Sequence, residues 1–193
     1  MQSQSTKFRT LAFVALALFG SVSTIPLSVS AAEQAITPER NPPGDIPDSQ
    51  VFVTYSGPGF SMKVPEGWSR NDIEGGARFD DKYNLISVTS SPTAAVPTIE
   101  SAKLGEAADL VATGHAVKVT DIKQVKLDGG SAVRIQYQSN SEPNAVTGKQ
   151  IRLERVRYLY FVGGKLIRLD MAAPAGADNV DQWLLMANSV KFK

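Results

Sequence analysis

The feature that most constrains the fold is a pair of long apolar stretches, residues 150–162 and 165–171, joined by Gly163-Gly164. Two glycines between such stretches are typical of a tight β-hairpin, because glycine readily adopts the left-handed backbone conformations that two-residue turns require. Such a turn also sets the register, since it places the flanking residues directly opposite each other. The pairs predicted for one face are Val162 with Lys165, Tyr160 with Ile167, Tyr158 with Leu169, and Val156 with Met171. These pairs are apolar almost throughout, so this face is predicted to lie in the core.

The opposite face of the same hairpin mixes charged and apolar residues. Arg157 is predicted to lie opposite Asp170, where the two would form a cross-strand ion pair worth roughly 0.2–1 kcal/mol. Earlier in the first strand, Leu153 falls on the face opposite to the predicted core residues. This change of phase predicts either a β-bulge near Glu154-Arg155 or a second face that is itself apolar.

Apolar spacing along the rest of the chain predicts further strands and two helices. Alternating apolar and polar residues are typical of strands with one buried face, whereas helices place apolar residues three and four apart. Strands are predicted near 51–55, 60–64, 76–79, 84–90, 117–127 and 131–138, and helices near 97–114 and 178–188. Thr98 or Ser101 is expected to cap the first helix, and Gly114 to end it. Many strands with short turns favour the α+β class, an antiparallel β-sheet flanked by helices, over a doubly wound parallel sheet.

The first 32 residues have the pattern of a secretory signal peptide. Lys7 and Arg9 precede an apolar run at 11–19, and residues 30–32 (SAA) supply small side chains at the expected cleavage site. The apolar run is well short of the ~20 residues that a membrane-spanning helix needs. We therefore expect three parts, namely a signal peptide at 1–32, a proline-rich linker at 33–50 and a folded domain at 51–193.

Charge and cysteine content limit the cellular compartments and the classes of partner that we expect. The chain has 20 basic and 19 acidic residues, and loss of Lys7 and Arg9 with the leader keeps it near neutral. No long-range attraction to nucleic acid or anionic lipid is therefore expected. The absence of cysteine excludes disulfides, thiolate metal sites and a cysteine-linked lipid anchor. We expect an extracytoplasmic globule, in the periplasm, cell envelope, thylakoid lumen or medium, with no transmembrane segment after cleavage.

Sequence motifs for catalysis or cofactor binding are missing. His115 is the only histidine, which excludes multi-histidine metal sites, and there is no nucleophile elbow, phosphate-binding loop or dinucleotide fingerprint. Because His115 follows Gly114, we interpret it as a helix C-terminal histidine favoured by the helix dipole; the alternative is a base or a lone metal ligand. Asp80 and Asp81 could bind a hard cation, but a solvated turn between strands explains them more simply. These residues predict no cofactor.

Arginines are concentrated in the later strands, where they could form a surface for an acidic partner. Glu154 and Asp170 lie among them in the sequence, so mutual pairing on a solvated face is the alternative. The candidate partner-binding residues are Arg134, Arg152, Arg155, Arg157 and Arg168.

Four stretches of the chain resemble the PsbP-like family, which includes the extrinsic photosystem II subunit PsbP and many exported bacterial proteins. They are GFSMKVPEGW (59–68), RFDDKYNLISVTSSP (78–92), GGKLIRLDMAAP (163–174) and SVKF (189–192) after a tryptophan-bearing helix. The resemblance implies an α/β/α sandwich, no enzymatic activity, docking onto another protein, and a link to calcium. The family's cyanobacterial members are usually lipid-anchored through a cysteine, which this chain does not have.

Taken together, the sequence predicts a non-catalytic exported protein-binding module that docks onto a larger envelope or membrane complex. Its expected contact surfaces are residues 33–50, residues 139–149 and the arginine-rich strands. One alternative is a photosystem II extrinsic or assembly factor that supports the oxygen-evolving complex. Another is a small hydrolase that uses His115 with a serine. The sequence leaves the partner and the oligomeric state open.

Overall fold

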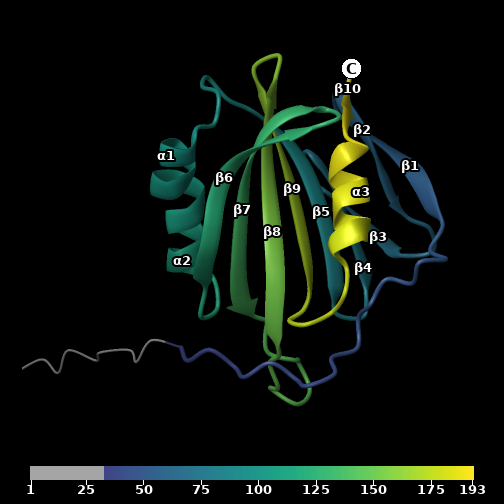
Figure 1. The fold of residues 1–193 in the computed structure, drawn as a ribbon, viewed down its shortest axis with the longest axis vertical. Coiled ribbons are helices and arrows are strands. Elements are labelled where there is room, and N and C mark those ends of the chain that lie inside the picture. The colour runs from purple at the N-terminus through teal and green to yellow at the C-terminus, as the bar shows by residue number, and fades with distance from the viewer. Residues whose placement is uncertain (1–32) are drawn as a thin grey trace, which may run out of the picture. The chain divides into compact units, whose positions relative to one another are not determined.

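A seven-stranded antiparallel sheet forms the body of the protein (Figure 1). The computed structural model describes residues 33–193, so the predicted signal peptide at 1–32 lies outside the described residues. The strand order is β3-β4-β5-β9-β8-β7-β6, which makes the hairpin of β8 and β9 central. The strands are β3 (Ser69–Ile73), β4 (Gly76–Asp81), β5 (Asn84–Pro92), β6 (Lys118–Leu127), β7 (Gly130–Asn140), β8 (Arg152–Val162) and β9 (Lys165–Pro174).

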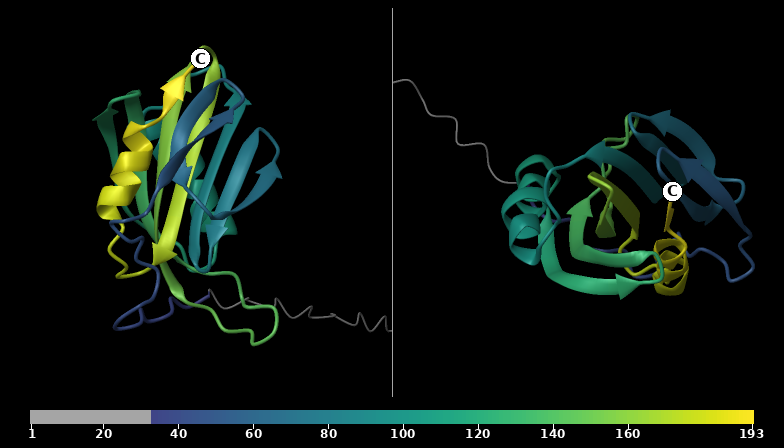
Figure 2. Two further views of the ribbon diagram at one scale, coloured as in Figure 1. Left: turned by 90° about the vertical axis from the view of Figure 1, so that its right-hand side faces the viewer. Right: turned by 90° about the horizontal axis from the view of Figure 1, so that it is seen from above.

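Helices lie on both sides of this sheet, and a small second sheet lies beside one of them (Figure 2). One face is covered by a helix in three parts, α1 (Ile99–Ala102), a π-helical turn η1 (Lys103–Ala107) and α2 (Ala108–Thr113). The other face is covered by α3 (Val180–Asn188) and a three-stranded sheet of β1 (Phe52–Gly57), β2 (Phe60–Pro65) and β10 (Lys191–Phe192). This arrangement confirms the predicted α+β class, with an antiparallel sheet flanked by helices.

The central hairpin has the predicted register. Val162 pairs with Lys165, Tyr160 with Ile167, Tyr158 with Leu169, and Val156 with Met171. Gly163 and Gly164 take φ values of 56° and 75°, a backbone conformation that costs a side-chain-bearing residue energy but costs glycine little. Pairing continues without a break through Glu154 and Arg155. The β-bulge alternative is therefore wrong, and the apolar second face is correct.

Two apolar clusters explain why both faces of the hairpin carry apolar residues. The larger lies between the seven-stranded sheet, α3 and the small sheet, and includes Tyr160, Leu169 and Met186. The smaller lies beneath α1 and η1, where Leu159 and Leu166 meet the helix. A sheet with both faces covered buries apolar residues on both, so the simple in–out alternation of a half-exposed strand fails in β8.

Two strands were not predicted. β3 consists of residues that are all exposed, so it has no apolar alternation and is held by its backbone pairing with β4. β10 has two residues, and its pairing with β2 is set by where α3 ends. Thr98 caps the first helix as expected, accepting a hydrogen bond from the Ser101 backbone while the Ser101 side chain accepts one from Thr98.

Residues 33–50 contain no helix or strand, but they pack against the sheet. Ile46 is buried in the larger cluster, and its amide donates to Asn179 Oδ1 at 2.6 Å. The carbonyl of Gly44 accepts hydrogen bonds from the side chains of Asn84 and Asn179. Residues 33–50 therefore belong to the same compact unit as the sheet, and the boundary expected at residue 51 lies inside that unit. No helix within residues 33–193 is long and apolar enough to cross a membrane.

Candidate functional site

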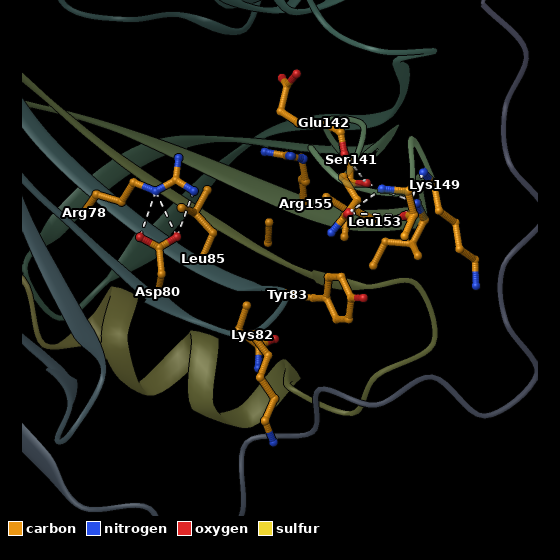
Figure 3. Close-up of a pocket in the computed structure, with 15 residues that line it drawn as sticks. Arg78, Asp80, Lys82, Tyr83, Leu85, Ser141, Glu142, Lys149, Leu153 and Arg155 are labelled. Carbon is orange, nitrogen blue, oxygen red and sulfur yellow. Dashed lines mark hydrogen bonds and ion pairs between the residues drawn. The ribbon is translucent and has the colours of Figure 1, made fainter.

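A polar cleft of about 370 Å³ opens at one end of the large sheet (Figure 3). Its walls are the turn between β4 and β5 and the loop of residues 141–151 between β7 and β8. The row Asp80, Leu85, Ala172 and Arg155 runs across its floor on four neighbouring strands, because direct antiparallel partners point to the same face. The lining residues are Arg78, Asp80, Lys82, Tyr83, Asn84, Leu85, Ser141, Glu142, Asn144, Thr147, Lys149, Ile151, Leu153, Arg155 and Ala172.

The cleft lies on the same face of the sheet as the helix α1–η1–α2. Asp170 and Arg157, one register row further along, pair with each other and are covered by Glu106 of η1. Arg155 follows in the next row on the same face of β8, where it lines the cleft instead. Among the described side chains, Glu106 therefore pairs with Arg157 of β8 and not with Arg155.

Four cationic side chains line the cleft, and their pairing differs. Arg78 is held by Asp80 at 2.8 Å, and Lys149 lies 3.6 Å from Glu39 of the N-terminal segment. Arg155 donates to Ser139 Oγ at 2.8 Å. Within residues 33–193, neither Arg155 nor Lys82 forms an ion pair. The lining also includes the carboxylates of Asp80 and Glu142, so the four cationic side chains outnumber the acidic ones.

The other four candidate arginines are engaged within the fold. Arg134 donates to Asp121 Oδ2 at 2.8 Å from β7 to the neighbouring β6. Arg152 is buried, and its guanidinium donates to the Ala116 carbonyl and to Asn140 Oδ1. Arg157 and Arg168 both pair with Glu106. Of the five, Arg155 lines the cleft.

Glu106 links the helix to the sheet through a half-buried ionic network. Its two carboxylate oxygens lie 2.6 Å from Arg157 and 2.6 Å from Arg168, and Arg157 also lies 2.6 Å from Asp170. Burial favours the neutral acid, but the hydrogen bond from Arg168 and the two guanidinium charges hold the pKa of Glu106 below its usual value. Burial would lower the pKa of Arg157, but Asp170 raises it above its usual value. Glu106 and Arg157 therefore stay charged at neutral pH.

His115 joins the N-terminal segment to the loop beside the cleft. Its Nδ1 lies 2.7 Å from Glu33 and its Nε2 lies 3.0 Å from Glu142. Glu33 also accepts a hydrogen bond from Asn140. Both ring nitrogens therefore contact carboxylates, and His115 links the N-terminal segment to the loop of residues 141–151.

Hydrogen bonding to Glu33 raises the pKa of His115 above its ordinary value, and Glu142 adds to this effect. Such a group stabilises the contact fully below its unfolded pKa, near 6.5, and the contribution is lost as the pH rises through the raised value. We expect Glu33→Gln to lower the pKa of His115 more than Glu142→Gln does, as measured by NMR titration of the imidazole. A wild-type His115 pKa at the ordinary value would contradict this arrangement.

The acidic residues near the β4–β5 turn do not converge. Asp72 pairs with Arg70, and Asp80 pairs with Arg78. Among residues 33–193 there is no group of three or more His, Asp or Glu side chains arranged to hold a metal ion.

Sequence reasoning named the loop 139–149 and Arg155 separately, but did not bring them together with Arg78, Lys82 and Tyr83. Only the neighbouring positions of β5, β9 and β8 do so. The sequence did indicate the turn through the polar run Asp80-Asp81-Lys82. In the structure Lys82 takes a φ of 52° there, as in a tight turn.

Comparisons with known proteins show the fold. Neither a family model nor a curated protein sequence matches the chain. The solution structure of cyanobacterial PsbP (CyanoP) from Synechocystis is 18% identical with a TM-score of 0.52, over 79% of this chain and 100% of that one. Two other solved structures have lower TM-scores. A Bacteroides thetaiotaomicron protein is 15% identical over 69% of this chain and 45% of that one, with a TM-score of 0.44. LpqN, involved in cell envelope biogenesis of Mycobacterium tuberculosis, is 14% identical over 75% and 91%, with a TM-score of 0.45. By its likeness to CyanoP, the chain has the PsbP-like fold.

Proposed function

We propose that this protein is a non-catalytic exported binding module that docks peripherally onto a larger protein complex through its cationic cleft. The observation that carries the proposal is the contrast among the arginines of the later strands. Arg134, Arg157 and Arg168 form ion pairs within the fold, and Arg152 is buried. Arg155 is half-buried and donates to Ser139, but, like Lys82 across the cleft, it forms no ion pair among the described residues. Unneutralised charge at a concave surface favours association with a partner of opposite charge.

The export part of the proposal rests on the N-terminal pattern, in which a basic start, a short apolar run and small residues precede Glu33. Attachment at the membrane surface would then come from a partner protein, because the chain has no cysteine for a lipid anchor.

A second candidate is a supporting or assembly role at a photosystem II complex. The structural likeness to a cyanobacterial PsbP favours it. This candidate requires a phototrophic source organism, and a deletion strain would show reduced oxygen evolution.

Affinity capture from the native envelope tests the docking proposal. The full chain, tagged and expressed in its own host so that export proceeds, is cross-linked and purified with its partner. We expect Arg155→Glu to reduce recovery of that partner by about tenfold or more, since reversing a charge in a desolvated contact costs several kcal/mol. Lys126→Glu is the matched control, because it makes the same change of charge on exposed β6 and does not line the cleft.

Equal recovery with both variants would show that the cleft is not the docking surface. A saturable partner that Arg155→Glu loses and Lys126→Glu keeps would support the proposal.

A further inference from the structure

We infer that the cleft binds an extended acidic peptide segment, with Arg155, Lys82 and Lys149 contacting successive carboxylates. The inference rests on the proposed docking function and names the chemistry of the partner. It follows from how the charges are distributed, what the floor is made of, and which carboxylates the chain itself brings to the cleft.

The cationic groups are spread along the cleft rather than gathered at one point. In Figure 3, Arg78 and Asp80 lie at one end, Lys149 lies at the other, and Lys82 and Arg155 lie on opposite sides between them. A compact anion such as phosphate would reach only part of this set. A chain with carboxylates at intervals would satisfy it along its whole length, which gives both charge pairing and register.

Apolar residues form part of the floor, between Asp80 and Arg155. Leu153 and Ala172 are 5% and 1% exposed, and Leu85 lies directly opposite Ala172. Apolar floor atoms exclude water from one side of a bound carboxylate, which strengthens its attraction to a guanidinium above the value in open solvent. Tyr83 on the rim is 51% exposed, and its ring gives an apolar surface for the methylene groups of glutamate side chains.

The chain places two carboxylates of its own at the cleft. Glu142 lines it and bonds to His115, and Glu39 lies at its margin. Glu39 lies 3.6 Å from Lys149, and these side chains are 48% and 73% exposed. An ion pair so exposed is worth at most about 1 kcal/mol, so a partner carboxylate can replace Glu39 at little cost. The N-terminal segment thus shows the kind of group that this end of the cleft accepts.

Peptide titration tests the inference. Dye-labelled hexaglutamate is titrated with the signal-cleaved protein at low ionic strength and followed by fluorescence anisotropy, with hexaglutamine as the uncharged comparison. We expect saturable binding of hexaglutamate that weakens as salt is added, and no binding of hexaglutamine. Arg155→Glu and Lys149→Glu should each weaken the affinity about tenfold or more, whereas Lys126→Glu should leave it within about twofold. Lys149 lies in an exposed loop, so its variant tests the cleft even where Arg155→Glu disturbs folding.

Two results would overturn the inference. One is the absence of hexaglutamate binding at low salt; the other is competition by inorganic phosphate at concentrations similar to the peptide, which would indicate a site for a compact anion. The inference and the proposed function fail separately. Capture of a partner that needs Arg155, without peptide binding, would remove the acidic segment and keep the docking function. Peptide binding without any captured partner would keep the acidic segment and remove the docking function.

Discussion

Glu106→Gln is expected to lower the free energy of unfolding by about 3–5 kcal/mol, the cost of breaking a buried ion pair from one side. The amide that replaces the carboxylate carries no charge, so Arg157 and Arg168 would face each other beneath the helix with Asp170 as the remaining neutralising group. The side chains of Glu106 and Arg157 are 19% and 17% exposed, so water cannot fully replace the lost charge. Urea unfolding at neutral pH measures the difference.

Glu100→Gln is the matched control, because it makes the same change at an exposed position of α1. It should change stability by no more than about 0.5 kcal/mol. A loss below about 1 kcal/mol for Glu106→Gln would mean that the network behaves as a surface ion pair.

The same variant should also change how stability depends on pH. The folded-state pKa of Glu106 is lowered, so its contribution is present above its unfolded pKa and is lost as the pH falls through the lowered value. Burial raises the pKa of the neighbouring Asp170, which acts in the opposite direction. The charge of Glu106 also contributes to the raised pKa of Asp170. The difference between the wild-type and Glu106→Gln curves therefore reports Glu106 together with its effect on Asp170, and it should shrink in acid.

Tyr160→Ala is expected to cost about 3–5 kcal/mol, the range for removing a buried aromatic ring. Tyr160 is 0% exposed, its ring packs near those of Tyr158 and Phe192, and its hydroxyl donates to the Ala187 carbonyl at 2.9 Å. This one side chain therefore links the central strand β8 to α3 and β10. Loss of the ring leaves a cavity between the layers and an unpaired carbonyl at the end of α3.

Tyr160→Phe separates these two effects. It keeps the ring and removes the hydrogen bond, so it should cost about 1–3 kcal/mol. Tyr83→Ala, at an exposed aromatic position on the cleft rim, should be nearly neutral for stability. If Tyr160→Phe were as costly as Tyr160→Ala, the hydrogen bond rather than packing would hold α3 against the sheet. Thermal and urea unfolding of the three variants make the comparison.

The sequence predicted correctly those features that depend on interactions within a few residues. The turn at Gly163-Gly164 defines its own register, because a two-residue turn places the flanking residues directly opposite each other. The cap at Thr98 is similar, since both hydrogen bonds of the box lie within four residues. β3 was not predicted, because a strand without buried residues has no apolar pattern.

The candidate site was predicted less well, because the role of an arginine depends on groups far away in the chain. Nothing near Arg157 in the sequence shows that Glu106, 51 residues earlier, neutralises it. Nor does anything near Arg155 in the sequence show that this residue lines a cleft together with Lys82. The five arginines look alike in sequence and differ in exposure and pairing once folded.

By itself, the sequence determined the α+β class, the central hairpin with its register, the positions of the helices, and the absence of known catalytic motifs. These depend on periodicity, turn chemistry and residue type, which act over a few residues. Only the tertiary structure decided which face each strand buries, that residues 33–50 pack against the sheet, and which cations remain available at the cleft. Those properties depend on burial and charge pairing between segments that meet only when the sheet is assembled. Their energies come from removing groups from water, and no single stretch of the chain shows which groups these will be.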